Sequence, residues 1–457
     1  MTLQPIQKYK PKEYVETPHT SKENFIIGNI QNIENIENIE HIGQKTFNII
    51  QEQQPQSSLS SPRQQDIQPE EQREQQPQPL HENEIIDEFD ISPPSADDRY
   101  KFNNIDISEL FYQFQLSVKN YLTSSQTPSL QLESHLQHIL SLSSILLLKP
   151  NRFHDDLKKI IDQGILENIV TDINKQLNLN MNEFDNSIII KLFSIFKNIR
   201  KNELDRMVAA MEVMKLMEQT KDHMSKKILI SVRNLIENLP MKNLDEDIKE
   251  IELITRYVHP LLSPLLDDIT NNIMFRWTST TNQEWKTSFS ISKRRPDSNI
   301  TETNGTFYDK SFGFGEVKCK SMALNHYATN KDLLRIAHFS KNSIDTHSIN
   351  SVLSFTVVGD YITFYIMMLK SDGLYVMLEI GHIKIPMSVY EIPTYIAHLD
   401  ELLDVLHVYY NTILNQPIQP TSTNNRKRKT ITTPQFDKIV DKTKDKKRKS
   451  ISSHYNH

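Results

Sequence analysis

Three residues in the C-terminal half of the chain have the types and spacing needed for metal-assisted chemistry. Asp297 follows a proline, and further along the chain Glu316 and Lys318 stand two positions apart. On a strand, residues two apart point to the same face, so Glu316 and Lys318 share a face while Val317 points to the opposite, buried side. If Asp297 lies on the neighbouring strand, two carboxylates and one amine converge.

Such a group suits hydrolysis of a phosphodiester. Two carboxylates supply the hard oxygen ligands that Mg²⁺ prefers, and Mn²⁺ can replace it. The metal lowers the pKa of a bound water and neutralises charge on the phosphate, while the lysine orients the water or stabilises the developing anion.

The elements that must position these residues follow from hydrophobic periodicity. The pattern predicts a helix through 251–257, a second helix over 330–347 and a closing helix over 395–410. Alternating and β-branched runs predict strands between them, over 273–278, 289–292, 297–303, 313–319, 352–358, 361–369 and 374–380. One sheet with helices packed on it is the expected α/β architecture.

The register of the two strands decides whether the carboxylates meet. A two-residue turn at Asn304 and Gly305 would pair Asp297 with Phe312, four residues from Glu316. At about 3.3 Å per residue, that is too far to share one ion. Either the connection is a longer loop over 303–310, which we favour, or bulges at Gly313 and Gly315 slide the strand.

The run Arg294-Arg-Pro-Asp297, followed by Gly313-Phe-Gly-Glu-Val-Lys318 and preceded by Glu252, Tyr257 and Pro260, resembles the PD-(D/E)xK nuclease superfamily. It is also similar to a group of uncharacterised fungal proteins with this domain, over about 252–400. The resemblance implies a restriction-endonuclease-like core with one mixed sheet flanked by helices, over 244–412. It implies Asp297 and Glu316 as metal ligands, Glu252 as a third acid, Lys318 as the water-positioning residue and Lys341 as an auxiliary phosphate contact.

Further basic residues could meet a nucleic acid. Lys293, Arg294 and Arg295 precede the first acid, where they either contact a phosphate backbone or form a solvated strand end. Two hypotheses therefore stand: a Mg²⁺-dependent nuclease, and a catalytically inactive nuclease-like fold that serves as a nucleic-acid or protein binding scaffold.

The preceding region, 101–243, is expected to be an all-α helical bundle. Apolar spacings of three and four predict helices over 109–116, 131–148, 182–199 and 222–239. This region is a candidate for binding a protein partner. Its stripe of Met207, Met211, Met214 and Met217 is either a partner groove or, as is more common, ordinary core.

Both ends of the chain differ from this middle. Residues 1–100 carry 18 acidic and 8 basic side chains, and 51–80 contains eleven Gln and five Pro, which predicts a disordered acidic arm. The tail, 413–457, is predicted to be disordered and basic. Its two clusters are typical of a bipartite nuclear localisation signal that binds an import receptor, with a nucleic-acid tether and solvated filler as alternatives. The clusters comprise Arg426, Lys427, Arg428 and Lys429, and Lys446, Lys447, Arg448 and Lys449.

Composition excludes several other classes. A single cysteine rules out an internal disulfide and indicates the cytosol or nucleus, of which the basic clusters favour the nucleus. The chain shows no apolar stretch near 18 residues, so no membrane association is expected. The 16 histidines show no familiar zinc-ligand spacing, so zinc is not indicated.

Overall fold

The structure is a computed structural model that describes residues 89–124, 129–278, 295–416 and 426–441. These residues all belong to one compact unit. Most of the predicted acidic arm lies outside the described residues, as do the predicted strand 289–292, Lys293, Arg294 and the second basic cluster.

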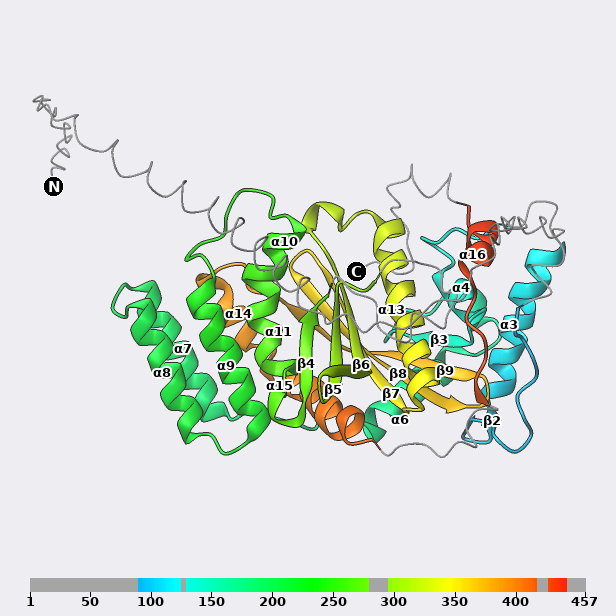
Figure 1. Ribbon diagram of the computed structural model, residues 1–457, viewed down its shortest axis with the longest axis horizontal. Coiled ribbons are helices and arrows are strands. Elements are labelled where there is room, and N and C mark those ends of the chain that lie inside the picture. Colours follow the sequence, from blue (N-terminus) through cyan, green and yellow to red (C-terminus); the bar gives the residue numbers. More distant parts are fainter. Residues whose placement is uncertain (1–88, 125–128, 279–294, 417–425, 442–457) are drawn as a thin grey trace, which may run out of the picture. The chain divides into compact units, whose positions relative to one another are not determined.

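A mixed seven-stranded sheet forms the centre of the unit (Figure 1). Its strand order is β3-β9-β8-β7-β6-β5-β4, with β3–β9 and β6–β7 parallel and the other pairs antiparallel. The strands are β3 Ile145–Leu148, β4 Ile273–Trp277, β5 Ser298–Asn304, β6 Phe307–Lys318, β7 Ser351–Val358, β8 Tyr361–Ser371 and β9 Leu374–Lys384. A mixed sheet in the C-terminal half is thus confirmed, together with its flanking helices.

Helix α13, His326–His347, connects β6 to the parallel strand β7 and packs across β6, β7 and β8. Ser340 on this helix contacts Ser354 on one face of the sheet. On the opposite face, α15 (Leu399–His407) packs on β9, where Gly381 leaves room for Val405. The sheet is therefore covered on both faces, as parallel strand pairs require.

Helices also precede the six C-terminal strands of the sheet, as the sequence predicts. They are α3 Ile107–Ser124, α4 Leu136–Ser141, α5 Asp155–Lys158, α6 Gln163–Gln176, α7 Asn186–Arg200, α8 Arg206–Gln219 and α9 His223–Asn238, with a small hairpin of β1 Lys101–Phe102 and β2 Ile105–Asp106. One continuous helical stretch then leads to the sheet, formed by α10 Glu250–Glu252, the π-helical turn η1 Leu253–Val258 and α11 His259–Leu266. Pro260 and Pro264 lack the N–H groups that regular α-helical bonding would use, which explains the irregular bonding there.

The remaining elements are short. They are η2 Ile269–Asn271, η3 Lys320–Met322, η4 Val389–Glu391, α14 Ile392–Ile396, the π-helical η5 Val408–Leu414 that extends α15, and α16 Thr433–Ile439. Within the described residues, no helix combines the length and apolar character needed to cross a bilayer.

The prediction of one long helix over 131–148 is wrong in its second half. The chain forms α4 and then turns into β3, which pairs with β9 at the edge of the sheet. The run Ile145–Leu148 is buried throughout, and a short, fully apolar run fits a buried strand as well as a helix. The region before the nuclease-like segment is therefore not all-α, because it contributes a strand to the central sheet.

The prediction of a disordered tail is wrong for residues 426–441. Arg426 pairs with Asp98 at 2.5 Å and Arg428 pairs with Asp372 at 2.7 Å. Phe436 and Ile439 of α16 are buried, so an apolar stripe holds this segment to the unit. The first basic cluster thus contributes to the fold.

Two helices bury faces that periodicity alone does not identify. Met207 and Met211 on α8 are 72% and 56% exposed and so are not ordinary core, because Ala209, Val213 and their neighbours form the buried face. On α13, the polar residues Arg335, His338 and Asn342 are buried, because residues 130–143 and the C-terminal segment cover the side of the helix away from the sheet.

Candidate active site

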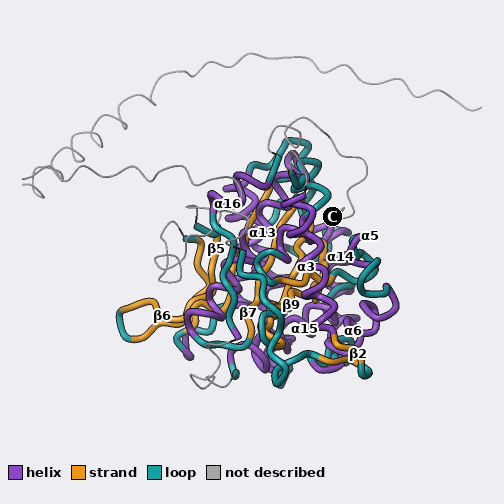
Figure 2. The backbone as a smooth tube through the Cα atoms, turned by 90° about the vertical axis from the view of Figure 1, so that its right-hand side faces the viewer, coloured by secondary structure: helices purple, strands orange, loops and turns teal. Residues whose placement is uncertain are grey.

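The hairpin of β5 and β6 brings Asp297 beside Glu316. The turn comprises Gly305, whose φ is +60°, and Thr306, with Asn304 paired to Phe307. Register shifts then occur between Ile300 and Thr303, so that Ser298 faces Gly315. The bulge alternative is confirmed and the longer loop is wrong, although the irregularity lies nearer the turn than predicted. Figure 2 shows this hairpin projecting beside the label β6.

Asp297 and the β6 residues lie as strand alternation predicts. One carboxylate oxygen of Asp297, Oδ2, accepts a hydrogen bond of 2.9 Å from the backbone N–H of Val317. The Val317 side chain is fully buried on the other face, whereas Glu316 and Lys318 both face α13. The sequence-predicted trio is therefore brought together at the carboxyl end of β6, a common location for sites in α/β folds.

Helix α13 adds two charged residues that the motif did not include. Arg335 donates to Glu316 Oε2 at 2.9 Å, to Asp332 Oδ1 at 3.1 Å and to the carbonyl oxygen of Arg295 at 2.6 Å. Asp332 also pairs with Lys318 at 3.2 Å. The guanidinium thus links helix, strand and the chain segment that enters β5.

The helical acid at the site is Glu250 rather than Glu252. Glu250 Oε2 lies 3.3 Å from Lys318 Nζ, whereas Glu252 pairs with Arg256 on an exposed helical surface. The two glutamates are two positions apart, so a helix points them in different directions.

Burial and mutual charge shift the pKa values of the site. Burial raises the pKa of Glu316 well above its ordinary value, and Arg335 opposes this shift only in part. Burial likewise raises the pKa of Asp332. Burial alone would lower the pKa of Lys318, but the surrounding carboxylates, led by Asp332 and Asp297, raise it, so Lys318 remains an ammonium ion.

The site holds more acidic than basic side chains. Four carboxylates (Asp297, Glu316, Asp332 and Glu250) face two cations (Lys318 and Arg335), a formal excess of two negative charges. Glu316 Oε1 is buried without a hydrogen-bond partner among the described residues. An unpartnered buried carboxylate oxygen is costly unless something binds it, and carboxylate oxygens are the ligands that Mg²⁺ prefers.

Of the predicted basic contacts, Lys341 does not lie at the site. Lys341 is fully buried and donates to the carbonyl oxygen of Arg428 and to Thr430 Oγ1, so it holds the C-terminal segment. Arg295 is exposed at the entrance to β5, while Lys293 and Arg294 lie outside the described residues.

Sequence reasoning missed Asp332, Arg335 and Glu250 as members of the site. Asp332 and Arg335 are three apart on a predicted helix, which signals a shared face. Comparisons with protein-family models, curated proteins and solved structures find no match to this chain.

Proposed function

We propose that this protein is a Mg²⁺-dependent phosphodiester hydrolase that acts on nucleic acid in the nucleus. The observation that carries the proposal is the buried, unpartnered Glu316 Oε1 within a group that has excess negative charge. Asp297 and Glu316 would hold Mg²⁺, or Mn²⁺ in its place. Bound there, the metal would activate a water and neutralise charge on the scissile phosphate.

The protein's own residues supply positioning and positive charge. Lys318, kept protonated by its neighbours, stabilises the negative charge that develops on the phosphate and does not act as a base. Arg335 fixes the Glu316 carboxylate through Oε2, leaving Oε1 as the oxygen that remains to bind the metal. Exposed Arg295 is a candidate contact for the nucleic-acid backbone.

A second candidate function is a binding scaffold that has lost catalysis. Two observations favour it: Glu316 is only 1% exposed and already paired with Arg335, and apolar side chains are exposed on α7 and α8. The latter comprise Ile190, Phe193, Met207 and Met211. Replacing Glu316 distinguishes the two candidate functions, because only the enzyme needs its carboxylate for turnover.

The test is cleavage of end-labelled DNA and RNA by the purified full chain, with Mg²⁺, with Mn²⁺ and with a chelator. We expect metal-dependent cleavage, lowered at least about a hundredfold in Glu316→Gln, as when a main electrostatic contact is removed. Glu302→Gln is the matched control, because Glu302 pairs with Lys310 elsewhere on the same hairpin. Equal cleavage by wild type and Glu316→Gln, or none by wild type, would favour the scaffold.

A further inference from the structure

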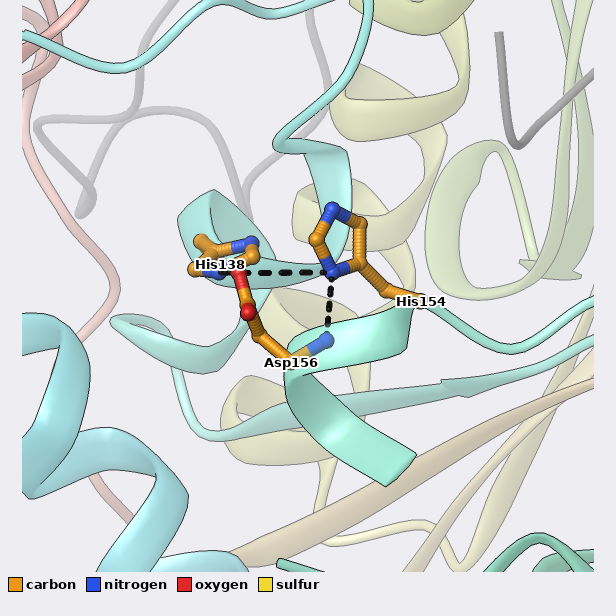
Figure 3. A group of neighbouring side chains, drawn as sticks. All are labelled: His138, His154 and Asp156. Atoms are coloured by element: carbon orange, nitrogen blue, oxygen red, sulfur yellow. Dashed lines mark hydrogen bonds and ion pairs between the residues drawn. The ribbon is translucent and has the colours of Figure 1, made fainter. Parts of the chain in front are cut away.

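A second group of side chains of the types that bind metal ions lies in the N-terminal helical region. His138 belongs to α4, His154 precedes the first turn of α5, and Asp156 lies within that turn. Figure 3 shows the three side chains turned toward one another. None of them belongs to the candidate active site, so the group is independent of the proposed function.

The spacing of the donor atoms is close to that of a metal centre. Asp156 Oδ2 lies 3.2 Å from His138 Nε2 and 3.7 Å from His154 Nδ1. One donor atom from each residue lies within 4.8 Å of the other two. In a tetrahedral zinc site with bonds of about 2.0–2.2 Å, ligand atoms are about 3.3 Å apart. Small rotations would thus complete three corners of a tetrahedron.

The chemistry of the donors selects the class of ion. Two imidazole nitrogens and one carboxylate oxygen suit zinc and neighbouring transition metals, whereas Mg²⁺ and Ca²⁺ favour oxygen ligands alone. Both histidines are buried, and the His138 nitrogen that faces Asp156 is Nε2. This buried nitrogen would coordinate a bound ion.

The surroundings orient the carboxylate and leave one side open. Lys159 holds Asp156 Oδ1 at 2.6 Å, so that Oδ2 faces the histidines. A pocket of about 390 Å³ adjoins the group and is lined by His135, His138, Asp156, Lys159 and Tyr121, among others. At present His154 Nδ1 accepts a 3.1 Å hydrogen bond from the Asp156 backbone N–H, and coordination would replace that bond.

We infer that His138, His154 and Asp156 bind a zinc-class divalent transition-metal ion, with the fourth position open to the adjoining pocket for water or another small ligand. Sequence reasoning missed this site because the ligands do not follow a familiar spacing. Its only signal is four residues, His135, His138, His154 and Asp156, close together in the chain.

The test is calorimetric titration of the metal-stripped full chain with Zn²⁺. We expect a saturable site whose affinity falls at least about tenfold in Asp156→Asn and in His154→Gln, a loss that even outer-shell changes can cause. The matched control is Asp155→Asn, because Asp155 is the adjacent acid but points to Lys158 with its side chain 58% exposed. The Asp297→Asn/Glu316→Gln double variant should keep the site, which excludes binding at the candidate active site.

A second measurement is needed in case the Asp156 and His154 variants fail to fold. Co²⁺ added to the wild type and to the Asp297→Asn/Glu316→Gln variant should give the intense visible bands of four-coordinate cobalt, and Zn²⁺ should abolish them. Weak, octahedral-type bands, or a Zn²⁺ affinity unchanged in folded Asp156→Asn, would overturn the inference.

Discussion

Lys318 and Val317 are neighbours on β6 with different roles. Replacing Lys318 should mainly affect activity, and replacing Val317 should mainly affect stability. Lys318→Ala should lower metal-dependent cleavage at least about a hundredfold while the chain still folds, because Arg335 continues to pair with Asp332 and Glu316. Val317→Thr should do the reverse, because it buries a hydroxyl in an apolar site at a cost of about 1–3 kcal/mol. Cleavage assays paired with thermal melting test this, and equal effects on both quantities would contradict it.

Gly315 is required by a close approach between strands. A Cβ atom there would lie 2.1 Å from Phe355 Cζ and 2.4 Å from Ser298 Oγ. We therefore expect Gly315→Ala to lower the free energy of unfolding by about 1–3 kcal/mol in urea denaturation. Adding Phe355→Leu should recover part of that loss, because the smaller side chain makes room. If the two changes were simply additive, the steric explanation would be wrong.

The sequence predicted those features of the site that depend only on local structure. Strand alternation places Glu316 and Lys318 on one face without knowledge of the fold. The bulges that bring Asp297 opposite Glu316 were one of two alternatives, because turn chemistry alone does not fix how many residues slip. Asp332 and Arg335 were missed, since their inclusion depends on what covers α13.

Helix α13 links the sheet to the N-terminal helical region. His338 on this helix is buried and shares a 3.0 Å hydrogen bond with Ser143 Oγ, next to β3. Asn330, nearer the start of the same helix, donates to the carbonyl oxygens of Leu132 and Glu133. A helix that resembles a surface element in periodicity is therefore enclosed, which single-sequence patterns cannot reveal.

Burial of His338 predicts a pH dependence. Burial, with Lys341 nearby, lowers the pKa of His338 to about 3, whereas the unfolded chain titrates near its ordinary value of about 6.5. Between these values the unfolded state binds more protons, so the stabilisation present above pH 6.5 is lost as pH falls toward 3.

We expect the free energy of unfolding to fall less between pH 7 and pH 5 in His338→Gln than in wild type, measured by urea denaturation. The comparison with wild type is essential because the raised pKa values of Glu316 and Asp332 act in the opposite direction. The exposed His223→Gln serves as the control. An identical acid response in wild type and His338→Gln would contradict this assignment.

Segments that are distant in the sequence together complete one compact unit. β3 joins the sheet beside β9, and Leu130 forms a bridge with Val440. The predicted boundary near residue 243 therefore does not divide the described residues into independently packed parts. Composition identifies the parts of the chain with few hydrophobic residues, which are then predicted to be disordered. It cannot show that a short basic segment pairs with Asp98 and Asp372.

The C-terminal segment divides the two basic clusters that the proposed nuclear import depends on. In the first basic cluster, Arg426 and Arg428 are held in ion pairs and Lys427 donates to the carbonyl oxygen of Asp345, so these side chains are engaged within the fold. Import should then depend on 446–449. Deleting 442–457 should move a tagged protein from nucleus to cytosol without lowering its melting temperature. Arg428→Ala should lower the melting temperature, because it leaves buried Asp372 without that partner, but should not change localisation. Nuclear enrichment that survives the deletion would contradict the import proposal.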